Sequence, residues 1–121
     1  MMRRGEIWLA RLNPNTGAEI GKIRPVLILL AQRYLDAGSP VVMAAPLTTQ
    51  FWPGLAALRM PVTARERLLK GSYVVLEQMR AMDRGRFGDV PLARLSAAEL
   101  QTVDRQLMTM FGVSIDPDWN H

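Results

Sequence analysis

Residues 24–31 read RPVLILLA, an unbroken apolar run that follows one arginine and one proline. A short continuous run of this kind is typical of a strand that is buried on both faces. Because proline donates no ladder hydrogen bond, Pro25 must begin this strand or lie where it has an edge. We therefore expect residues 24–31 to form a central strand of the fold, with Arg24 at its foot.

Further strands are expected on either side of this run, bounded by turn-forming residues. They cover residues 5–12, 41–47, 55–62 and 72–79. Residues 80–83 either extend the last of these or begin another strand, and residues 32–39 form a short helix or turn. Trp8 alternates with charged neighbours and is expected in the core. The ten-residue loop 13–22 is long for a small barrel, and such loops are often functional.

The clearest local signal lies near the C-terminus. Ser96 and Glu99 have the spacing of a capping box, and Gly112 is a stop signal. Between them apolar residues recur at helical spacing, namely Leu100, Val103, Leu107, Met110 and Phe111. The whole chain, residues 1–121, is therefore predicted to be a single mainly β domain with α structure. We expect a small, closed SH3-like β-barrel with a C-terminal amphipathic helix packed across it.

Composition excludes several kinds of chemistry. The chain has no cysteine, and its only histidine is the last residue, His121. Thiol catalysis, a two-histidine ribonuclease mechanism and a histidine-assisted serine hydrolase are thus excluded. No glycine-rich phosphate loop and no metal-ligand spacing occur. Any catalysis must use arginine, glutamate, threonine, serine, tyrosine or glutamine, and we expect neither a metal nor a cofactor.

The charge is uneven along the chain. Residues 1–95 carry a net charge of +7, residues 96–121 carry −3, and thirteen of the fifteen cations are arginine. A body this basic attracts nucleic acid or an acidic protein, although a merely solvated basic surface gives the same count. No segment approaches the ~20 apolar residues of a membrane span, and no signal peptide is evident. A cytoplasmic protein without membrane contact is expected.

Several short motifs occur in one order along residues 3–111. They are Arg4-Gly5-Glu6-Ile7-Trp8, Asn13-Pro14, Gly17-x-Glu19, Arg24-Pro25, Pro46-x-Thr48-Thr49 and Glu77-Gln78-x-Arg80. In order and spacing the chain resembles the MazF/PemK family of type II toxin–antitoxin toxins. One departure is Val75, where PemK-like members place an arginine, and this favours a MazF-like arrangement.

The resemblance implies a CcdB/PemK-like barrel, a homodimer and an acidic antitoxin partner, together with which the toxin binds DNA. It implies sequence-specific cleavage of single-stranded RNA, foremost messenger RNA, by the RNA's own 2′-OH. The ends would be a 2′,3′-cyclic phosphate and a 5′-OH, and translation and growth would stop. The family's active-site positions fall on Glu19, Arg24 and Thr48. Expected RNA-binding positions are Lys22, Thr49, Phe51, Trp52, Gln78 and Arg80.

Elementary chemistry supports these assignments without deciding between roles. Glu19 can serve as the base for the 2′-OH, and the planar fork of Arg24 can hold two phosphoryl oxygens. Which of the two transfers the proton stays open. Each residue also has an ordinary structural interpretation: a solvated carboxylate for Glu19, a strand-edge charge for Arg24 and turn chemistry for Thr48.

The supporting residues have alternatives as well. Gln78, expected inside a strand, can satisfy a buried backbone group, while Phe51 and Trp52 either stack on bases or pack on the barrel. For the whole protein, a CcdB-like gyrase poison and a non-catalytic RNA-binding barrel are the competing functions. The C-terminal Trp119-Asn120-His121 only partly matches the Trp-Gly-Ile ending of CcdB-like chains.

Overall fold

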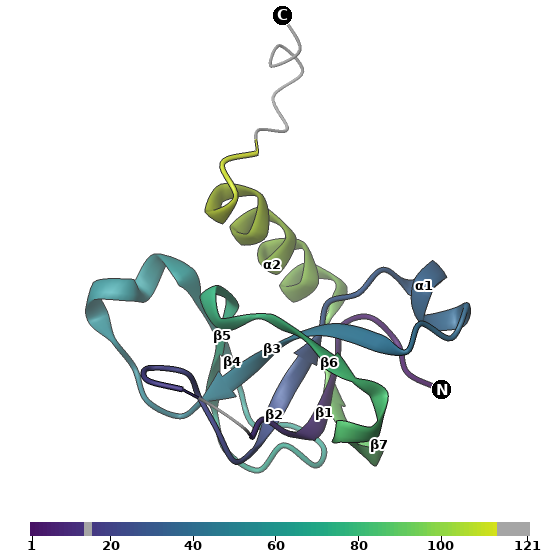
Figure 1. Ribbon diagram of the computed structural model, residues 1–121. Coiled ribbons are helices and arrows are strands. Elements are labelled where there is room, and N and C mark those ends of the chain that lie inside the picture. The colour runs from purple at the N-terminus through teal and green to yellow at the C-terminus, as the bar shows by residue number, and fades with distance from the viewer. Residues whose placement is uncertain (14–15, 114–121) are drawn as a thin grey trace, which may run out of the picture.

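Strand β2 lies in the middle of one curved, antiparallel sheet, as its apolar sequence predicts (Figure 1). The computed structural model describes residues 1–13 and 16–113. The strands are β1 (Glu6–Arg11), β2 (Ile23–Ile28), β3 (Val41–Thr48), β4 (Arg59–Val62), β5 (Ser72–Val75), β6 (Arg80–Asp83) and β7 (Phe87–Arg94). The helices are α1 (Gln32–Asp36) and α2 (Ala97–Met110), with 3₁₀ turns η1 (Pro53–Leu58), η2 (Leu76–Gln78) and η3 (Arg84–Arg86).

The sheet runs in the order β4-β5-β3-β2-β1-β7, and β6 pairs with the first half of β3. The predicted mainly β fold with a C-terminal helix is confirmed. The barrel is not closed by strand pairing, however, since no ladder joins β4 to β7 among the described residues. A backbone hydrogen bond crosses the opening, in which the Arg67 amide donates to the Leu92 carbonyl at 2.8 Å.

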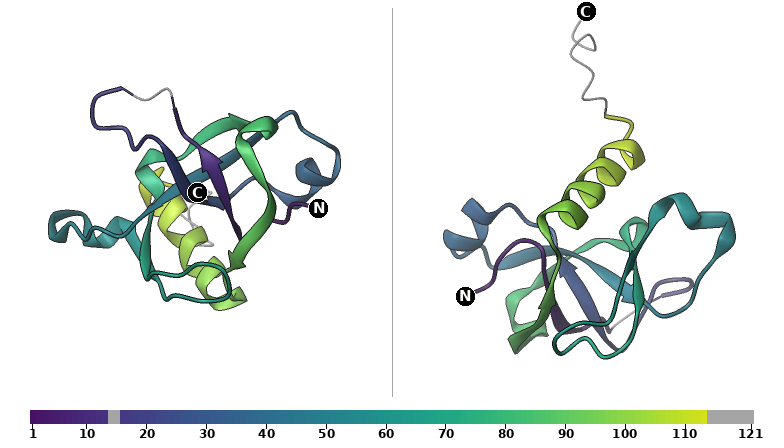
Figure 2. Two further views of the ribbon diagram at one scale, coloured as in Figure 1. Left: turned by 90° about the horizontal axis from the view of Figure 1, so that it is seen from below. Right: turned by 180° about the vertical axis from the view of Figure 1, so that it is seen from behind.

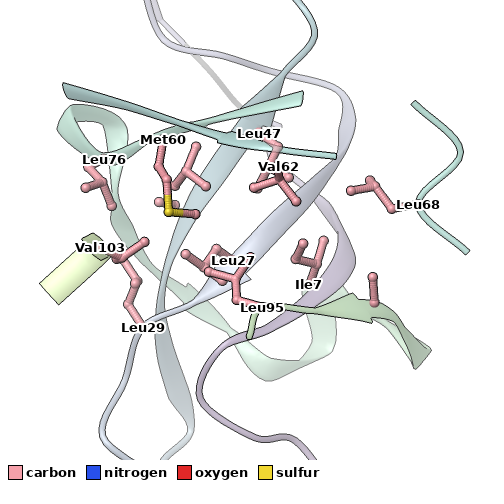
Figure 3. Close-up of a cluster of buried hydrophobic side chains, with 13 residues drawn as sticks. Ile7, Leu27, Leu29, Leu47, Met60, Val62, Leu68, Leu76, Leu95 and Val103 are labelled. Carbon is pink, nitrogen blue, oxygen red and sulfur yellow. The ribbon is translucent and has the colours of Figure 1, made fainter. Parts of the chain in front are cut away.

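Both faces of the central strands are buried. Leu27 belongs to a cluster that α2 covers, drawn in Figure 3, whereas Val26 and Ile28 belong to a second cluster with Trp8. Trp8 is buried, as predicted, and its indole N–H donates to Glu6. Pro25 opposes Leu9 of β1, and pairing with β3 begins only at Val26. At Pro25, therefore, β2 pairs with β1 only, and the backbone N–H that proline lacks is not needed for pairing with β3.

Helix α2 begins and ends where the sequence predicts. Ser96 Oγ accepts from the Glu99 amide, and the Glu99 carboxylate accepts from the Ser96 amide, which completes the capping box. Gly112 has a φ of 71° and ends the helix. Val103 is fully buried, and Leu100, Leu107 and Met110 pack against its cluster. Phe111, which we expected on the same face, is 65% exposed, because it is the C-cap residue beyond the last turn.

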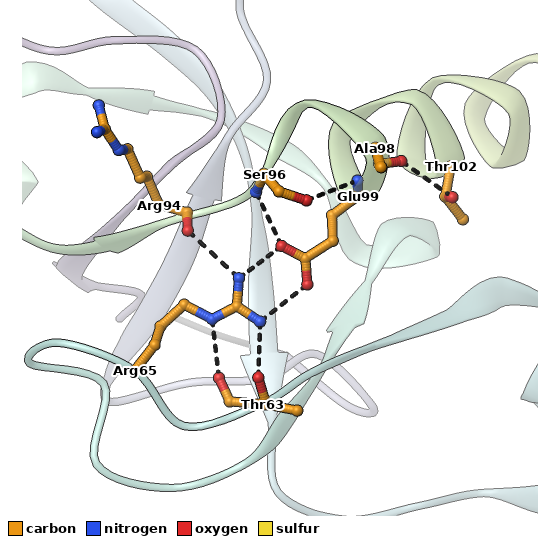
Figure 4. A network of polar contacts seen from close by, with 7 residues as sticks. All are labelled: Thr63, Arg65, Arg94, Ser96, Ala98, Glu99 and Thr102. Carbon is orange, nitrogen blue, oxygen red and sulfur yellow. Dashed lines mark hydrogen bonds and ion pairs between the residues drawn. The ribbon is translucent and has the colours of Figure 1, made fainter.

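An ion pair joins the start of α2 to the loop after β4. In Figure 4 the Arg65 guanidinium lies between Thr63 and the Glu99 carboxylate, with its two terminal nitrogens 2.5 and 2.8 Å from the carboxylate oxygens. The hydrogen bond from Arg65 and the bonds from Ser96 lower the pKa of Glu99 to about 2, against the opposing effect of burial. The same carboxylate therefore caps the helix and anchors it.

Several elements differ from the predictions. The expected strand 24–31 ends at Ile28. The expected strand 72–79 ends at Val75, and η2 follows it, while the expected strand 55–62 begins only at Arg59 after η1. Residues 80–83 form a separate strand, β6. Strand β7 was not expected, because it contains Gly88 and Pro91, both poor strand formers. Its irregular register against β1 accommodates them. No helix in the described ranges is long and apolar enough to cross a membrane.

Candidate functional site

The loop that carries Glu19 is closed at its base by two hydrogen bonds. The Leu12 amide donates to the Lys22 carbonyl at 2.7 Å, and the Lys22 amide donates to the Asn13 side chain at 2.9 Å. Lys22 takes a left-handed conformation with a φ of 65°, and its side chain is exposed. Within the loop, the Thr16 amide donates to Glu19 Oε1 at 2.8 Å. Part of the Glu19 carboxylate therefore stabilises its own turn. Pro14, part of the Asn13-Pro14 motif, lies outside the described residues.

Gln78 holds this loop from outside. Its amide oxygen accepts from the Ile20 amide at 2.7 Å, and its amide nitrogen donates to the Ala18 carbonyl at 3.1 Å. These two bonds flank Glu19 on either side along the chain. Gln78 was expected inside a strand, but it lies at the end of turn η2, which turns the chain away from β5. Its side chain thus reaches the loop rather than lying in the sheet.

A buried arginine that sequence reasoning missed holds the same turn. Arg59 at the start of β4 is only 8% exposed and forms an ion pair with Glu77, the neighbour of Gln78. A lone arginine between apolar residues, as in Leu58-Arg59-Met60, was the available signal. A buried charge needs a partner. The sequence alone does not predict that Glu77 is the partner of Arg59.

Arg24 and Thr48 lie at the ends of neighbouring strands. The paired residues of β2 and β3 run from Ile28–Ala44 to Val26–Pro46. If this register continues for two more residues, Arg24 lies opposite Thr48, just beyond the last paired residues. They nevertheless line different hollows. The Thr48 hollow also contains Trp52, Arg59 and Gln78. A smaller hollow beside it is lined by Glu19, Gln78 and Arg80, so Gln78 borders both.

The Arg24 hollow is strongly basic. Arg24, Arg67 and Lys70 line it together with Thr49, and no carboxylate is among the described residues that line it. Its volume of about 350 Å³ is more than ten times the ~30 Å³ of liquid that one water molecule occupies. Three cations on a lining that holds no carboxylate among the described residues suit a phosphate group. The sequence did not predict that Arg67 and Lys70 would join Arg24, because some forty residues separate them along the chain.

The remaining predicted residues are placed around these hollows. The Gln50 amide donates to Thr48 Oγ1 at 3.2 Å, so Thr48 does take part in a local turn. Phe51 and Trp52 are 50% and 59% exposed, and the Phe51 ring lies 5.2 Å from that of Tyr73. Arg80 donates to the Leu12 carbonyl and so supports the base of the Glu19 loop. The structure thus gathers Glu19, Thr48, Gln78 and Arg80, and it sets Arg24 and Thr49 beside them.

Comparison with known proteins identifies the family of the chain. The family model described as "PemK-like, MazF-like toxin of type II toxin-antitoxin system" matches residues 3–111, which is most of the chain. The chain belongs to this toxin family. A curated MazF-type relative, the "Endoribonuclease MazF" of Staphylococcus saprophyticus, is 32% identical over 117 residues, 93% of each chain.

Solved MazF structures show the same fold. The "Mycobacterium tuberculosis toxin MazF-mt6" has a TM-score of 0.74 at 24% identity, over 90% of this chain and 98% of that one. MazF from Deinococcus radiodurans has a TM-score of 0.72 at 24% identity, over 90% and 94%. A MazE-MazF structure from the same organism has a TM-score of 0.69 at 23% identity, over 92% and 96%. At these identities the likeness concerns the MazF fold alone.

Proposed function

We propose that this MazF/PemK-family toxin is an endoribonuclease that cuts single-stranded RNA, foremost messenger RNA, at preferred sequences. The observation that carries the proposal is the basic hollow of Arg24, Arg67 and Lys70, which lies beside Thr48 at the ends of β2 and β3. An RNA strand that crosses these strand ends contacts the basic hollow and the hollow of Glu19 in turn. We further propose that the protein acts in the cytoplasm, where such an RNA substrate occurs.

The proposed reaction uses the RNA's own 2′-OH. The 2′-oxygen attacks the adjacent phosphorus, the bond to the 5′-oxygen breaks, and the products end in a 2′,3′-cyclic phosphate and a 5′-OH. Glu19 accepts the 2′-OH proton, and the 5′-oxygen takes a proton from solvent. Arg24 stabilises the charge that develops on the phosphoryl oxygens, and Thr48 contributes a hydroxyl donor. Because Arg24, Arg67 and Lys70 supply positive charge near the phosphate, we propose that no metal ion is required.

We further propose a homodimer that an acidic antitoxin neutralises. Related toxins have been solved as MazE-MazF complexes and with a cognate antitoxin, which supports such a partner. Apolar side chains remain exposed on the single chain, among them Ile23, Leu69 and Phe111. An acidic segment that folds over the basic hollow would compete with RNA for Arg24. Its association rate should fall as the salt concentration rises.

The decisive experiment incubates the purified protein with a long RNA, with and without excess EDTA. Cleavage should persist in EDTA and leave cyclic-phosphate and 5′-OH ends. Ends of the 3′-OH and 5′-phosphate kind, or a strict need for Mg²⁺, would contradict the mechanism. RNA binding without any cleavage would instead indicate a non-catalytic RNA-binding barrel. Inhibition of gyrase without action on RNA would indicate a CcdB-like poison.

A further inference from the structure

We propose that Gln78 is a positioning residue that fixes Glu19 for the reaction, and that it does not itself contact RNA. The inference rests on the proposed function, since it takes Glu19 as the general base. It differs from the expectation that Gln78 binds RNA. It means that one side chain determines the conformation of a loop about sixty residues away in the sequence.

The hydrogen bonds of Gln78 leave its amide engaged with the loop. The oxygen accepts from Ile20 and the nitrogen donates to Ala18, at 2.7 and 3.1 Å. The two partners are backbone groups on either side of Glu19, so their positions determine where the Glu19 Cα lies. These bonds use one lone pair of the oxygen and one N–H of the nitrogen, so any base contact is limited to the remaining lone pair and N–H. The amide is therefore better suited to orient the loop than to read a base.

The turn that presents Gln78 is itself anchored. Glu77 pairs with the buried Arg59, and the Met79 amide donates to the Leu76 carbonyl at 3.0 Å. Leu76 is fully buried in the core cluster beneath α2. A packed leucine and an ion pair thus hold η2, so the amide of Gln78 acts from a rigid support. Active-site groups hold their geometry when such supports lock them.

The position of Gln78 also relates Glu19 to Thr48. Gln78 lines both the Thr48 hollow and the hollow that contains Glu19. A displacement of the loop about this side chain would change the distance between the two groups. Displacements of about 1 Å in a reacting geometry can cost roughly 10²-fold in rate. Loss of Gln78 should therefore lower the rate of the chemical step and leave RNA affinity almost unchanged.

The experiment compares Gln78→Met with the wild type in single-turnover cleavage at saturating RNA. Methionine keeps the length of the side chain and removes both hydrogen bonds. We expect a rate loss of about 10–100-fold with less than about 3-fold change in RNA affinity. Gln78→Glu retains an acceptor for Ile20 but not a donor for Ala18, so its rate should lie in between. Gln101→Met, an exposed glutamine on α2, is the matched control and should cleave like the wild type.

A double-mutant cycle identifies the residue through which Gln78 acts. If it acts through Glu19, Gln78→Met should slow the Glu19→Gln variant by less than about 3-fold. Multiplicative losses, or a fall in affinity that accounts for the slower cleavage, would overturn the inference in favour of direct RNA contact. A Glu19→Gln variant as fast as the wild type would overturn it as well.

Hydrogen exchange separates this inference from the proposed function, since it needs no RNA. The Ile20 amide should exchange at least several-fold faster in Gln78→Met, because its acceptor has been removed, while amides of β2 keep their protection. Unchanged exchange at Ile20 would reject the positioning role even if the protein cleaves RNA. If the wild type cleaves no RNA, the proposed function fails, and the positioning of a catalytic Glu19 fails with it. Faster exchange at Ile20 would then show only that Gln78 holds the loop.

Discussion

Helix α2 and the loop of Glu19 are both attached to the sheet, but by different means. Figure 1 shows the helix at the top of the molecule and the loop at the lower left, and the right-hand view of Figure 2 shows the loop at the lower right. The helix buries Val103 in the core cluster, and Arg65 and Arg4 pair with its carboxylates Glu99 and Asp104. The loop is held by side chains that bind its backbone, chiefly those of Gln78 and Arg80.

This difference predicts what each region contributes. Burial of apolar surface stabilises the fold by roughly 25 cal/mol for each Å². Polar contacts at the surface exchange one set of hydrogen bonds for another, and each has a net effect of only about 1 kcal/mol. Changes at α2 should therefore alter the free energy of unfolding and spare the specific activity. Changes around the loop and the strand ends should do the reverse.

The largest effect is expected from Arg24→Ala. The substitution removes a cation from the basic hollow and should slow single-turnover cleavage by about 10²–10³-fold, as loss of one oxyanion donor does. Arg24→Lys keeps the charge but loses the planar fork, so it should restore little. Thermal unfolding should barely change, because the Arg24 side chain is exposed.

Arg105→Ala is the matched control, since it removes one exposed arginine from α2. It should cleave nearly as fast as the wild type. A near-normal rate for Arg24→Ala would show that the active site lies elsewhere and that Arg24 is only a charged residue at a strand edge. Equal losses in both variants would mean that net charge, not the basic hollow, controls the reaction.

Local patterns predicted most of the fold but little of the site. Ser96 and Glu99 lie three residues apart, so the sequence alone predicted the capping box, and the apolar run predicted β2. Strand β7 depends on pairing with β1 across more than seventy residues, and its own composition argues against a strand. The contacts of Gln78 span 58 and 60 residues, and no local pattern encodes such a distance.

The site residues themselves came from a resemblance rather than from a pattern. Glu19, Arg24 and Thr48 were named by family position, and their separation into hollows followed only from the fold. The sequence did not single out Arg67 and Lys70, because neither belongs to one of the motifs and both are exposed cations in a loop. Their meeting with Arg24 depends on how the loop after β4 folds back toward β2.

The second prediction tests the helix side of the comparison. Val103→Ala removes two methyl groups from a fully buried position and should lower the free energy of unfolding by roughly 1–3 kcal/mol. Denaturant titration measures the loss, and cleavage per folded molecule should stay within about 2-fold of the wild type. Thr102→Ala, on the exposed side of α2, is the control and should change both quantities little. A large loss of specific activity in Val103→Ala would break the separation between the two regions.

The smallest effect concerns the anchoring carboxylate, and it depends on pH. Folding lowers the pKa of Glu99 from 4.5 to about 2, mainly through the hydrogen bond from Arg65. The stabilisation is therefore fully present above pH 4.5 and is lost as the pH falls toward 2, because the unfolded state takes up the proton first. For a partly exposed pair it should amount to about 1 kcal/mol at neutral pH.

Glu99→Gln should thus unfold more easily than the wild type at pH 7, and the difference should shrink as the pH falls from 4.5 toward 2. Asp89→Asn, at an exposed position of β7, is the control, because it removes a carboxylate that takes no part in the Arg65–Glu99 pair or the helix cap. If the two variants follow the same pH curve, net charge rather than the Arg65–Glu99 contact sets the acid stability. RNA cleavage at pH 7 should be unaffected in both, because neither residue lines the Arg24 hollow or the hollow of Glu19. A loss of cleavage with intact folding would mean that α2 and the loop are coupled, and the comparison between them would no longer hold.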